Sequence, residues 1–269
     1  MLERSMLVVV LALLASGCAT DEADTYIARD VEVLYDVGYD SLLKRRWTTA
    51  AAAFDEVERQ HPYSVWARRA QLMSAYAFYM DDEYDNAILA SERFLSLHPG
   101  NKNAAYAHYI IAISHYEQMS DVYRDQASTE KAQQGLLEVM RRYPGTDYAR
   151  DAKLKLDLVY DQLAAKDMEV GRFYLNQGYY LAATLRFRNV LDSYGETSHV
   201  PEALHRLVEC YTALGIEQEA QKYAAVLGYN HPGSKWYNRS YAMVTDTPGT
   251  PGNDADRSFF ARVFGFLGI

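Results

Sequence analysis

A pattern of small and large apolar residues that recurs five times along the chain constrains the fold more than any other feature. Its clearest copy runs from Lys166 to Gly195 and contains the small residues Gly171 and Ala183 and the large residue Phe187. Small residues let two helices cross closely, and large ones fill the gaps between neighbouring helices. A unit of this kind cannot bury its apolar face alone, so the pattern predicts a stack of helical hairpins.

The spacing inside each copy resembles that of a tetratricopeptide repeat, a helix–turn–helix unit of about 34 residues. The matching positions of the five first helices are Gly38, Ala75, Ala112, Gly171 and Val208. The matching alanines of the five second helices are Ala50, Ala87, Ala132, Ala183 and Ala220. The sequence therefore predicts an all-α chain that forms a right-handed superhelix of five tetratricopeptide-like helical hairpins.

Two of the five copies are longer than the others. The two series of positions place 8 additional residues inside the third repeat and 14 before the fourth. We expect the first insertion to form an enlarged loop from Glu117 to Thr129, with the next helix beginning at Glu130. Fourteen residues are close to four turns at about 3.6 residues per turn, so the second insertion keeps the apolar face in phase. No proline or glycine lies between Asp147 and Val170, so the fourth repeat is predicted to begin with one extended helix of roughly 30 residues.

Residues 1–17 form a predicted lipoprotein signal peptide. Arg4 precedes an apolar run from Leu7 to Ala15, far shorter than the roughly 20 residues of a membrane-spanning helix. The run ends in Leu14-Ala15-Ser16-Gly17-Cys18, which resembles the bacterial lipobox. The resemblance implies a covalent diacylglycerol and acyl chain on Cys18, and no other cofactor is expected. The alternative is an ordinary signal peptide cleaved nearby, which would leave Cys18 as a free thiol.

Lipidation would anchor the mature chain without a spanning helix, because several acyl chains together bind a bilayer stably whereas one binds only marginally. Ala19 follows the cysteine where aspartate would signal retention in the inner membrane. By analogy with proteobacterial lipoproteins, this indicates a lipid-anchored chain on the periplasmic face of the outer membrane. Residues 18–29 are then an acidic tether between the lipid and the fold.

The rest of the chain divides into three predicted parts. Residues 30–143 hold repeats 1–3, and residues 144–243 hold repeats 4 and 5. Residues 244–269 contain two Pro-Gly pairs, typical of a flexible linker, and then an apolar helical face. That face consists of Phe259, Phe260, Val263, Phe264 and Leu267. Folding back onto the last repeat and docking on a partner are both compatible with it.

Composition and motifs argue against several classes of function. A net charge of −9 and a pI near 5.3 argue against nucleic-acid binding. The histidines show no metal-ligand spacing, and His205 and Glu209, four residues apart, are interpreted as a surface pair. No phosphate loop or nucleophile elbow is present, so we expect no catalytic residues, no metal and no enzyme activity. Cys210, among apolar residues of a predicted helix, is expected to be a buried structural thiol.

Tyrosines are concentrated at the positions that face the concave side of stacked repeats, which are positions 2, 5, 9 and 12 of each first helix. Repeats 1–3 carry seven tyrosines at these positions, and repeats 4 and 5 carry none. The seven are Tyr35, Tyr39, Tyr76, Tyr79, Tyr106, Tyr109 and Tyr116. Tyrosine offers a large contact area at little cost in side-chain entropy, so we expect a groove that binds an extended peptide. The alternative is that some of the rings fill the interior of the superhelix.

Several short motifs go beyond the periodicity of generic repeat proteins. They are His61-Pro62-Tyr63, Arg124-Asp125-Gln126 in the enlarged loop, Arg142-Tyr143-Pro144, and Lys166-Asp167-Met168-Glu169-Val170-Gly171-Arg172. Together with the lipobox and the long fourth-repeat helix, they make the chain similar to the outer-membrane protein assembly factor BamD family, lipoproteins of five such repeats. The resemblance implies a non-enzymatic scaffold of the β-barrel assembly machinery.

The resemblance also implies partners. The N-terminal repeats of the family are held to receive the C-terminal targeting strand of unfolded outer-membrane β-barrel proteins, which ends in an aromatic residue. The C-terminal repeats dock on the POTRA region of BamA, and the implied docking residues here are Arg186 and Arg172. The anchor would add outer-membrane lipid as a partner, and no nucleic acid is implied. The alternative is another periplasmic tetratricopeptide lipoprotein, such as a pilus-assembly or cell-envelope coordination scaffold.

Overall fold

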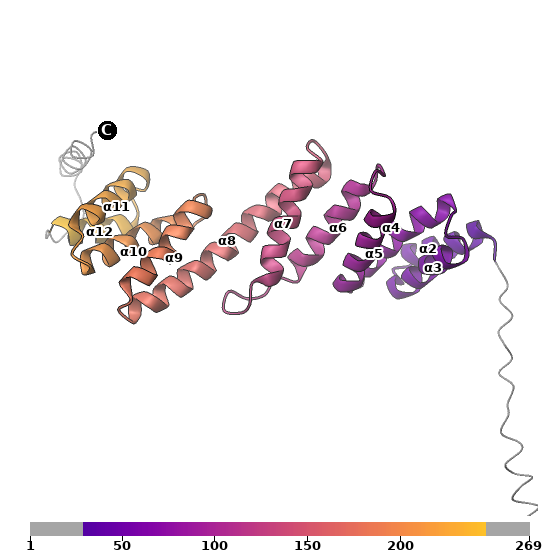
Figure 1. The fold of residues 1–269 in the computed structure, drawn as a ribbon, viewed down its shortest axis with the longest axis horizontal. Helices are drawn as coiled ribbons and strands as arrows, with labels where there is room; N and C mark the ends of the chain where they lie inside the picture. Colours follow the sequence, from indigo (N-terminus) through magenta and orange to yellow (C-terminus); the bar gives the residue numbers. More distant parts are fainter. Residues whose placement is uncertain (1–28, 246–269) are drawn as a thin grey trace, which may run out of the picture.

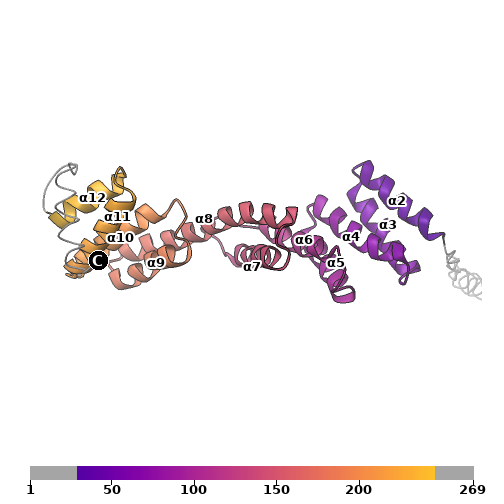
Figure 2. The ribbon, with the colours of Figure 1, turned by 90° about the horizontal axis from the view of Figure 1, so that it is seen from above.

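The computed structural model describes residues 29–245, which form eleven helices joined by short turns and one longer loop (Figures 1 and 2). The predicted signal peptide, Cys18, the predicted acidic tether up to residue 28 and the phenylalanine-rich C-terminal segment lie outside the described residues. The helices are α2 (Val31–Leu43), α3 (Trp47–Gln60), α4 (Val65–Met80), α5 (Tyr84–Leu97), α6 (Ala104–Glu117), α7 (Ala127–Arg142), α8 (Asp147–Asn176), α9 (Tyr180–Ser193), α10 (Val200–Ala213), α11 (Glu217–Asn230) and α12 (Lys235–Thr245).

The helices pair as five consecutive hairpins, which confirms the predicted all-α repeat architecture. Each helix packs against the next one in sequence, and the first helices α2, α4, α6 and α8 also contact one another in that order. The hairpins follow one another along an elongated body from α2 at one end to α11 and α12 at the other (Figure 1). Within residues 29–245, no helix is both long and apolar enough to cross a membrane.

Complementary sizes of facing side chains hold each hairpin together. A Cβ atom added at Gly38 would lie 2.7 Å from Phe54 Cε1, and one added at Gly171 would lie 2.8 Å from Phe187 Cδ1 and closer still to Cε1. Both phenylalanines are fully buried. A phenylalanine in the second helix therefore fits only where the first helix has no side chain.

The last hairpin uses the same two positions with the sizes exchanged. Val208 of α10 and Ala224 of α11 are both buried in one cluster, so the larger side chain now comes from the first helix. The shared requirement is the combined volume of the pair, because protein interiors are close-packed.

The turn inside four of the hairpins contains one residue with a positive φ. These residues are Arg45 (54°), Asp82 (60°), Gly178 (78°) and Gly215 (73°), each seven residues after the small or facing position of its first helix. Glycine adopts this conformation without a Cβ penalty, so the turns at Gly178 and Gly215 are the less strained pair. In the turn around Asp82, both Asp82 and Glu83 are exposed.

Helix α8 is one continuous helix of 30 residues, as the spacing predicted. Its first half, including Ala152, Leu156 and Val159, packs in one core with α6 and α7. Its second half, including Ala164 and Met168, packs in a different core with α9 and α10. The helix is roughly 45 Å long at about 1.5 Å per residue, and it belongs to both halves of the molecule.

The enlarged loop is shorter than predicted, because α7 begins at Ala127, three residues before Glu130. The buried Gln126 side chain organises this loop: its Nε2 donates to the carbonyl oxygens of Asp121 (3.0 Å) and Arg124 (3.1 Å). Helix α8 also holds the loop, since Gln162 Nε2 donates to the Ser120 carbonyl at 2.8 Å and Lys166 Nζ to that of Arg124 at 3.1 Å. The loop is therefore a fixed part of the surface beside α8.

Helix α12 was not predicted. It follows the fifth hairpin, packs against α10 and α11, and buries Tyr237 and Ser240 against them. It ends at Thr245, two residues inside the segment predicted to begin a flexible linker at 244. The helix covers an apolar side of the fifth hairpin.

Candidate functional site

Four of the predicted groove tyrosines form one aromatic row on the first helices. Tyr76 and Tyr79 of α4 and Tyr106 of α6 pack around the same small apolar cluster, and each is half-buried. Tyr109 lies one turn further along α6 and is half-buried as well. Each ring therefore contacts the core with one part and leaves another part at the surface.

A fifth ring, which the sequence analysis missed, extends the row. Tyr148 lies in the first turn of α8, with its ring centroid 5.5 Å from that of Tyr106 and 5.2 Å from that of Tyr109. It was overlooked because the inserted turns of α8 fall outside the repeat frame from which groove positions were counted. We call Tyr76, Tyr79, Tyr106, Tyr109 and Tyr148 the tyrosine row.

The other predicted groove tyrosines lie apart from the row. The ring of Tyr35 packs 4.8 Å from that of Trp66, and Tyr116 packs against the core beneath α7. Tyr39 is 47% exposed. A second tryptophan, Trp47, approaches the row from α3, with its ring 6.4 Å from that of Tyr76. Neither tryptophan was among the predicted groove residues, because only first-helix positions were counted and Trp66 stands just before them.

The hydroxyl groups of Tyr79 and Tyr109 are hydrogen-bond donors. Burial, with help from the nearby Glu117, raises the pKa of Tyr79 to about 12, and its hydroxyl points towards Glu117 at 3.4 Å. Burial and a hydrogen bond to Asp151 likewise raise the pKa of Tyr109. The Tyr109 hydroxyl donates to Asp151 Oδ2 at 2.5 Å, and Lys155 Nζ donates to the same oxygen at 2.8 Å.

These contacts set the charge state of Asp151. Burial acts to raise the pKa of Asp151, but the hydrogen bonds from Lys155 and Tyr109 outweigh it, so the pKa lies below its usual value. A carboxylate whose pKa is lowered on folding adds stability above its unfolded pKa of about 3.9, and this stability disappears as the pH falls through the folded pKa. The Tyr109–Asp151 bond therefore ties α6 to α8 most strongly near neutral pH.

Replacing Tyr109 by phenylalanine is expected to lower the free energy of unfolding by about 1 kcal/mol at pH 7, because Asp151 loses a donor at a partly exposed site. The loss should shrink as the pH falls towards 2, because protonation of the carboxyl removes the charge that strengthens the bond. Urea denaturation followed by circular dichroism at both pH values measures this. Tyr76→Phe is the control. An equal loss at both pH values would contradict the link to the Asp151 charge.

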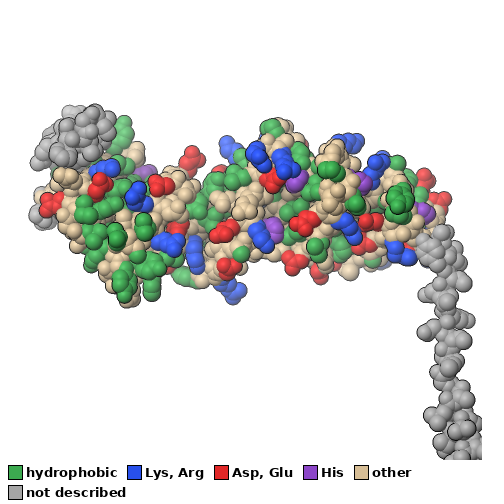
Figure 3. Space-filling model, viewed as in Figure 1, with side chains coloured by type: hydrophobic (Ala, Val, Ile, Leu, Met, Phe, Trp, Pro, Cys, Tyr) green, Lys and Arg blue, Asp and Glu red, His purple; other side chains and the backbone are tan. Residues whose placement is uncertain are grey.

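In the C-terminal half, Arg186 lies on α9 with 49% of its side chain exposed. Its Nη1 donates to Asp167 Oδ1 of α8 at 3.2 Å, and Asn189 Nδ2 donates to the other oxygen at 2.6 Å. The same helix exposes Leu181 (70%) and Leu185. Hydrophobic side chains gather over this end of the molecule, where α8 ends and α9 begins (Figure 3). The ion pair with Asp167 therefore fixes the position of Arg186, and its guanidinium stays accessible beside exposed apolar residues.

Arg172, the second predicted docking residue, lies in a network of ion pairs. It contacts Glu169 of its own helix at 2.5 Å and Glu202 of α10 at 3.1 Å. Arg206 continues the network, with contacts to Glu202 at 3.3 Å and to Glu209 at 2.8 Å. Arg172 therefore joins α8 to α10 and presents less free surface than Arg186.

The interpretation of His205 and Glu209 as a surface pair is wrong for the histidine. His205 is 3% exposed; its Nε2 lies 3.4 Å from Glu209 Oε1 and its Nδ1 lies 2.8 Å from Ser240 Oγ. The unpredicted α12 supplies Ser240 and so covers the ring. Cys210 is fully buried, and burial raises the pKa of its thiol to about 11, which confirms the predicted structural thiol.

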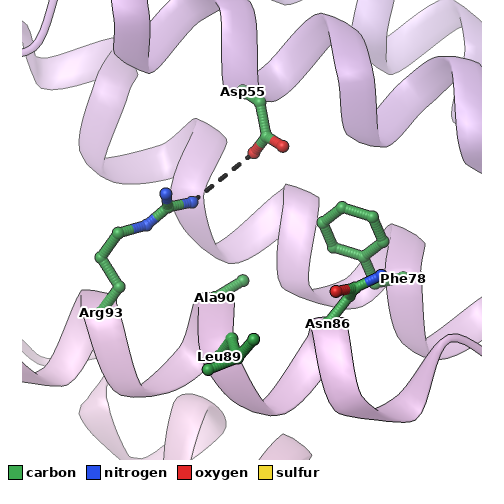
Figure 4. Close-up of a pocket in the computed structure, with 6 residues that line it drawn as sticks. All are labelled: Asp55, Phe78, Asn86, Leu89, Ala90 and Arg93. Atoms are coloured by element: carbon green, nitrogen blue, oxygen red, sulfur yellow. Dashed lines mark ion pairs between the residues drawn. The ribbon is translucent and has the colours of Figure 1, made fainter.

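A pocket of about 420 Å³ lies between the first two hairpins (Figure 4). Its lining residues are Asp55, Phe78, Asn86, Leu89, Ala90 and Arg93. Arg93 spans the space between the helices, 3.7 Å from Asp55 and 3.2 Å from Glu58. The two charged residues of the lining, Asp55 and Arg93, form an ion pair with each other, and this ion pair links α3 to α5. Among residues 29–245, no three histidine, cysteine or acidic residues are placed to hold a metal ion.

The fold and these surfaces define a helical-repeat scaffold with two separate candidate binding surfaces, one on each half. A family model described as "YfiO: Outer membrane lipoprotein" matches residues 28–227. The outer membrane protein assembly factor BamD of Caulobacter vibrioides is 50% identical over 241 residues, covering 88% of this chain and 79% of that protein. BamD of Rickettsia prowazekii is 41% identical over 235 residues, covering 87% and 94%. The chain belongs to the BamD family of outer membrane lipoproteins.

Membership confirms the resemblance, the outer-membrane location and the non-enzymatic class inferred from the sequence. A solved structure, the tetratricopeptide domain of P58(IPK), covers 88% of this chain and 66% of that chain, with a TM-score of 0.42 and 14% identity. Lipid attachment at Cys18 stays a prediction, because this residue lies outside the described part of the chain.

Proposed function

We propose that this chain is a non-enzymatic scaffold of the outer-membrane β-barrel assembly complex. In this proposal the N-terminal half binds targeting sequences of unfolded barrel proteins, and the C-terminal half docks on the POTRA region of a BamA-like partner. The observation that carries it is the tyrosine row, which lies across three first helices of a chain whose relatives are named outer membrane protein assembly factors.

The tyrosine row suits an extended peptide with aromatic side chains. Its rings are fixed by the core and by one another, so little side-chain entropy is lost when a ligand covers them. Edge-to-face and offset contacts with a ligand ring would each add about 0.5–1.5 kcal/mol to the burial of area. The hydroxyl protons of Tyr79 and Tyr109 are directed at Glu117 and Asp151, so the two hydroxyl oxygens offer acceptors for the N–H groups of the peptide backbone.

The surface around Arg186 suits a folded partner. It combines one accessible cation with the exposed Leu181 and Leu185, the mixture of arginine and apolar side chains that is common at the centre of protein interfaces. Arg172 supports this surface from beneath, because its ion pairs fix the end of α8 against α10. We therefore propose Arg186 as a direct contact and Arg172 as the residue that holds the docking surface in shape.

The test of the peptide site is the affinity of the mature chain for a synthetic peptide that ends in phenylalanine. Tyr76→Ala and Tyr109→Ala are each expected to weaken binding by about tenfold, as is typical of aromatic residues at the centre of an interface. Tyr76→Phe keeps the ring and should bind within about threefold of the parent chain. Fluorescence anisotropy measures the affinity, and circular dichroism measures the folded fraction.

Loss of stability without loss of peptide affinity would contradict the proposed peptide site. If the alanine variants lose stability but bind the peptide as tightly per folded molecule, the rings serve to fill the interior and the peptide site lies elsewhere.

A further inference from the structure

A second pocket, of about 350 Å³, lies where α4 and α6 begin. Its lining residues are Val65, Arg68, Arg69, Asn101, Lys102 and Asn103. Three of the six are cations, and no acidic residue is among them. We call this the basic pocket.

The cations of the basic pocket have no acidic partner within the part of the chain that the structure describes. Among residues 29–245, no carboxylate lies within ion-pair distance of Arg68, Arg69 or Lys102, although the chain as a whole carries a net charge of −9. The guanidinium of Arg69 packs 5.3 Å from the centre of the Trp66 ring, which leaves its outward N–H groups free to donate. Three cations kept close together without acidic partners indicate a place for an anion.

The start of α6 adds to the positive potential of the pocket. Asn103 is the N-cap residue of this 14-residue helix, and its side chain makes no capping hydrogen bond. The first N–H groups of a helix carry a partial positive charge that favours a bound anion. The N-terminal end of α6 lies beside the three side-chain cations, so its partial positive charge adds to the positive potential that they create in the pocket.

The basic pocket lies at the N-terminal ends of α4 and α6, two of the helices that carry the tyrosine row. Asn103 is one helical turn before Tyr106 on α6, and Arg69 is two turns before Tyr76 on α4. Leu72, between Arg69 and Tyr76, packs in the same cluster as Tyr106. A chain lying along the row can therefore place one of its ends in the pocket.

We infer that the basic pocket binds the terminal α-carboxylate of the peptide that lies on the tyrosine row. A carboxylate matches the paired N–H groups of an arginine, and such charge-assisted bonds are about twice as strong as neutral ones. The exposed Val65 at the pocket wall offers apolar contact to the last side chain of the peptide. The pocket would thus fix both the direction and the register of a ligand that the tyrosines alone hold only by stacking.

This inference rests on the proposed peptide site, and one pair of ligands separates the two. The same phenylalanine-ended peptide is made with a free C-terminal carboxylate and with a C-terminal amide, and both are titrated into the full mature chain. We expect the acid to bind about tenfold more tightly, a difference of about 1.4 kcal/mol. The difference should shrink at high salt, because the pocket is open to solvent.

The double variant Arg68→Gln/Lys102→Gln removes two of the three cations and should strongly reduce the preference for the acid while leaving the affinity for the amide unchanged. Both residues are exposed, so folding is expected to be preserved. The matched control is Arg141→Gln/Lys153→Gln, which removes two exposed cations of α7 and α8 outside the pocket and should keep the full preference.

Three other outcomes would overturn the inference. Equal affinities for acid and amide in the parent chain would remove it and leave the peptide site standing. Binding of neither peptide would contradict the proposed peptide site and the inference together. Equal peptide affinities combined with binding to phosphatidylglycerol vesicles that the pocket variant loses would assign the pocket to a lipid phosphate instead.

Discussion

Replacing Phe187 by alanine is expected to lower the free energy of unfolding of the C-terminal hairpins by about 3–5 kcal/mol, the usual cost of truncating a fully buried phenylalanine. Replacing Gly171 by valine should cost about 1–3 kcal/mol, because the added side chain would overlap the Phe187 ring. The double variant Gly171→Val/Phe187→Ala should lose less than the sum, since the valine fills part of the space that the ring vacates. Urea denaturation followed by circular dichroism measures each value.

The fifth hairpin supplies the reason to expect this coupling. Val208 and Ala224 occupy the equivalent positions and are both buried without a cavity-filling phenylalanine. The double variant copies that pair into the fourth hairpin, so the coupling energy should fall in the range of about 0.5–3 kcal/mol that is typical of residues in contact. A surface variant, Leu185→Ala on the exposed face of α9, serves as the control and should change the free energy of unfolding by less than about 0.5 kcal/mol. Strict additivity of the two core changes would contradict complementary packing.

The fold was predictable from the sequence because its packing is local. Each hairpin contacts its sequence neighbours, so a small residue such as Gly171 and its partner Phe187 are only 16 positions apart and leave a periodic trace. The same logic predicted the long α8, since an insertion of whole helical turns keeps the apolar face in register. Periodicity thus predicts the number and order of the repeat helices and the unusual length of α8.

Features outside the periodic frame were not predictable in the same way. Helix α12 follows the fifth repeat and lies outside the periodic spacing, so the spacing did not predict it. Because α12 covers His205, the interpretation of His205 as a surface residue was wrong as well. Tyr148 joins the tyrosine row from the inserted turns of α8. The basic pocket needs Arg68, near the start of α4, and Lys102, just before α6, to converge, although they are far apart in sequence. Only the superhelical arrangement brings such residues together.

Helix α8 connects the two proposed binding surfaces, so breaking it should separate their activities. Leu158 lies in its middle with 59% of its surface exposed, and proline there removes the N–H bond to residue 154 and clashes with the carbonyl of that residue. The change should cost about 3 kcal/mol and kink the helix. Because the Leu158 side chain is largely in solvent, the damage comes from the backbone and leaves most core contacts of both halves in place.

In the Leu158→Pro variant, peptide affinity and co-purification of a POTRA-containing barrel protein should each stay close to the parent values. Barrel assembly in reconstituted membranes should instead fall by about 10²-fold, because the fixed spacing that raises the effective concentration of a bound barrel chain at the partner is lost. Small-angle scattering would show the kink, and Leu158→Ala, which keeps the helix, should assemble barrels normally. By contrast, Arg186→Glu should lose co-purification alone and Tyr76→Ala peptide binding alone. Normal assembly by a variant with a demonstrated kink would show that α8 does not act as a spacer, and would leave the two surfaces as independent sites on one chain.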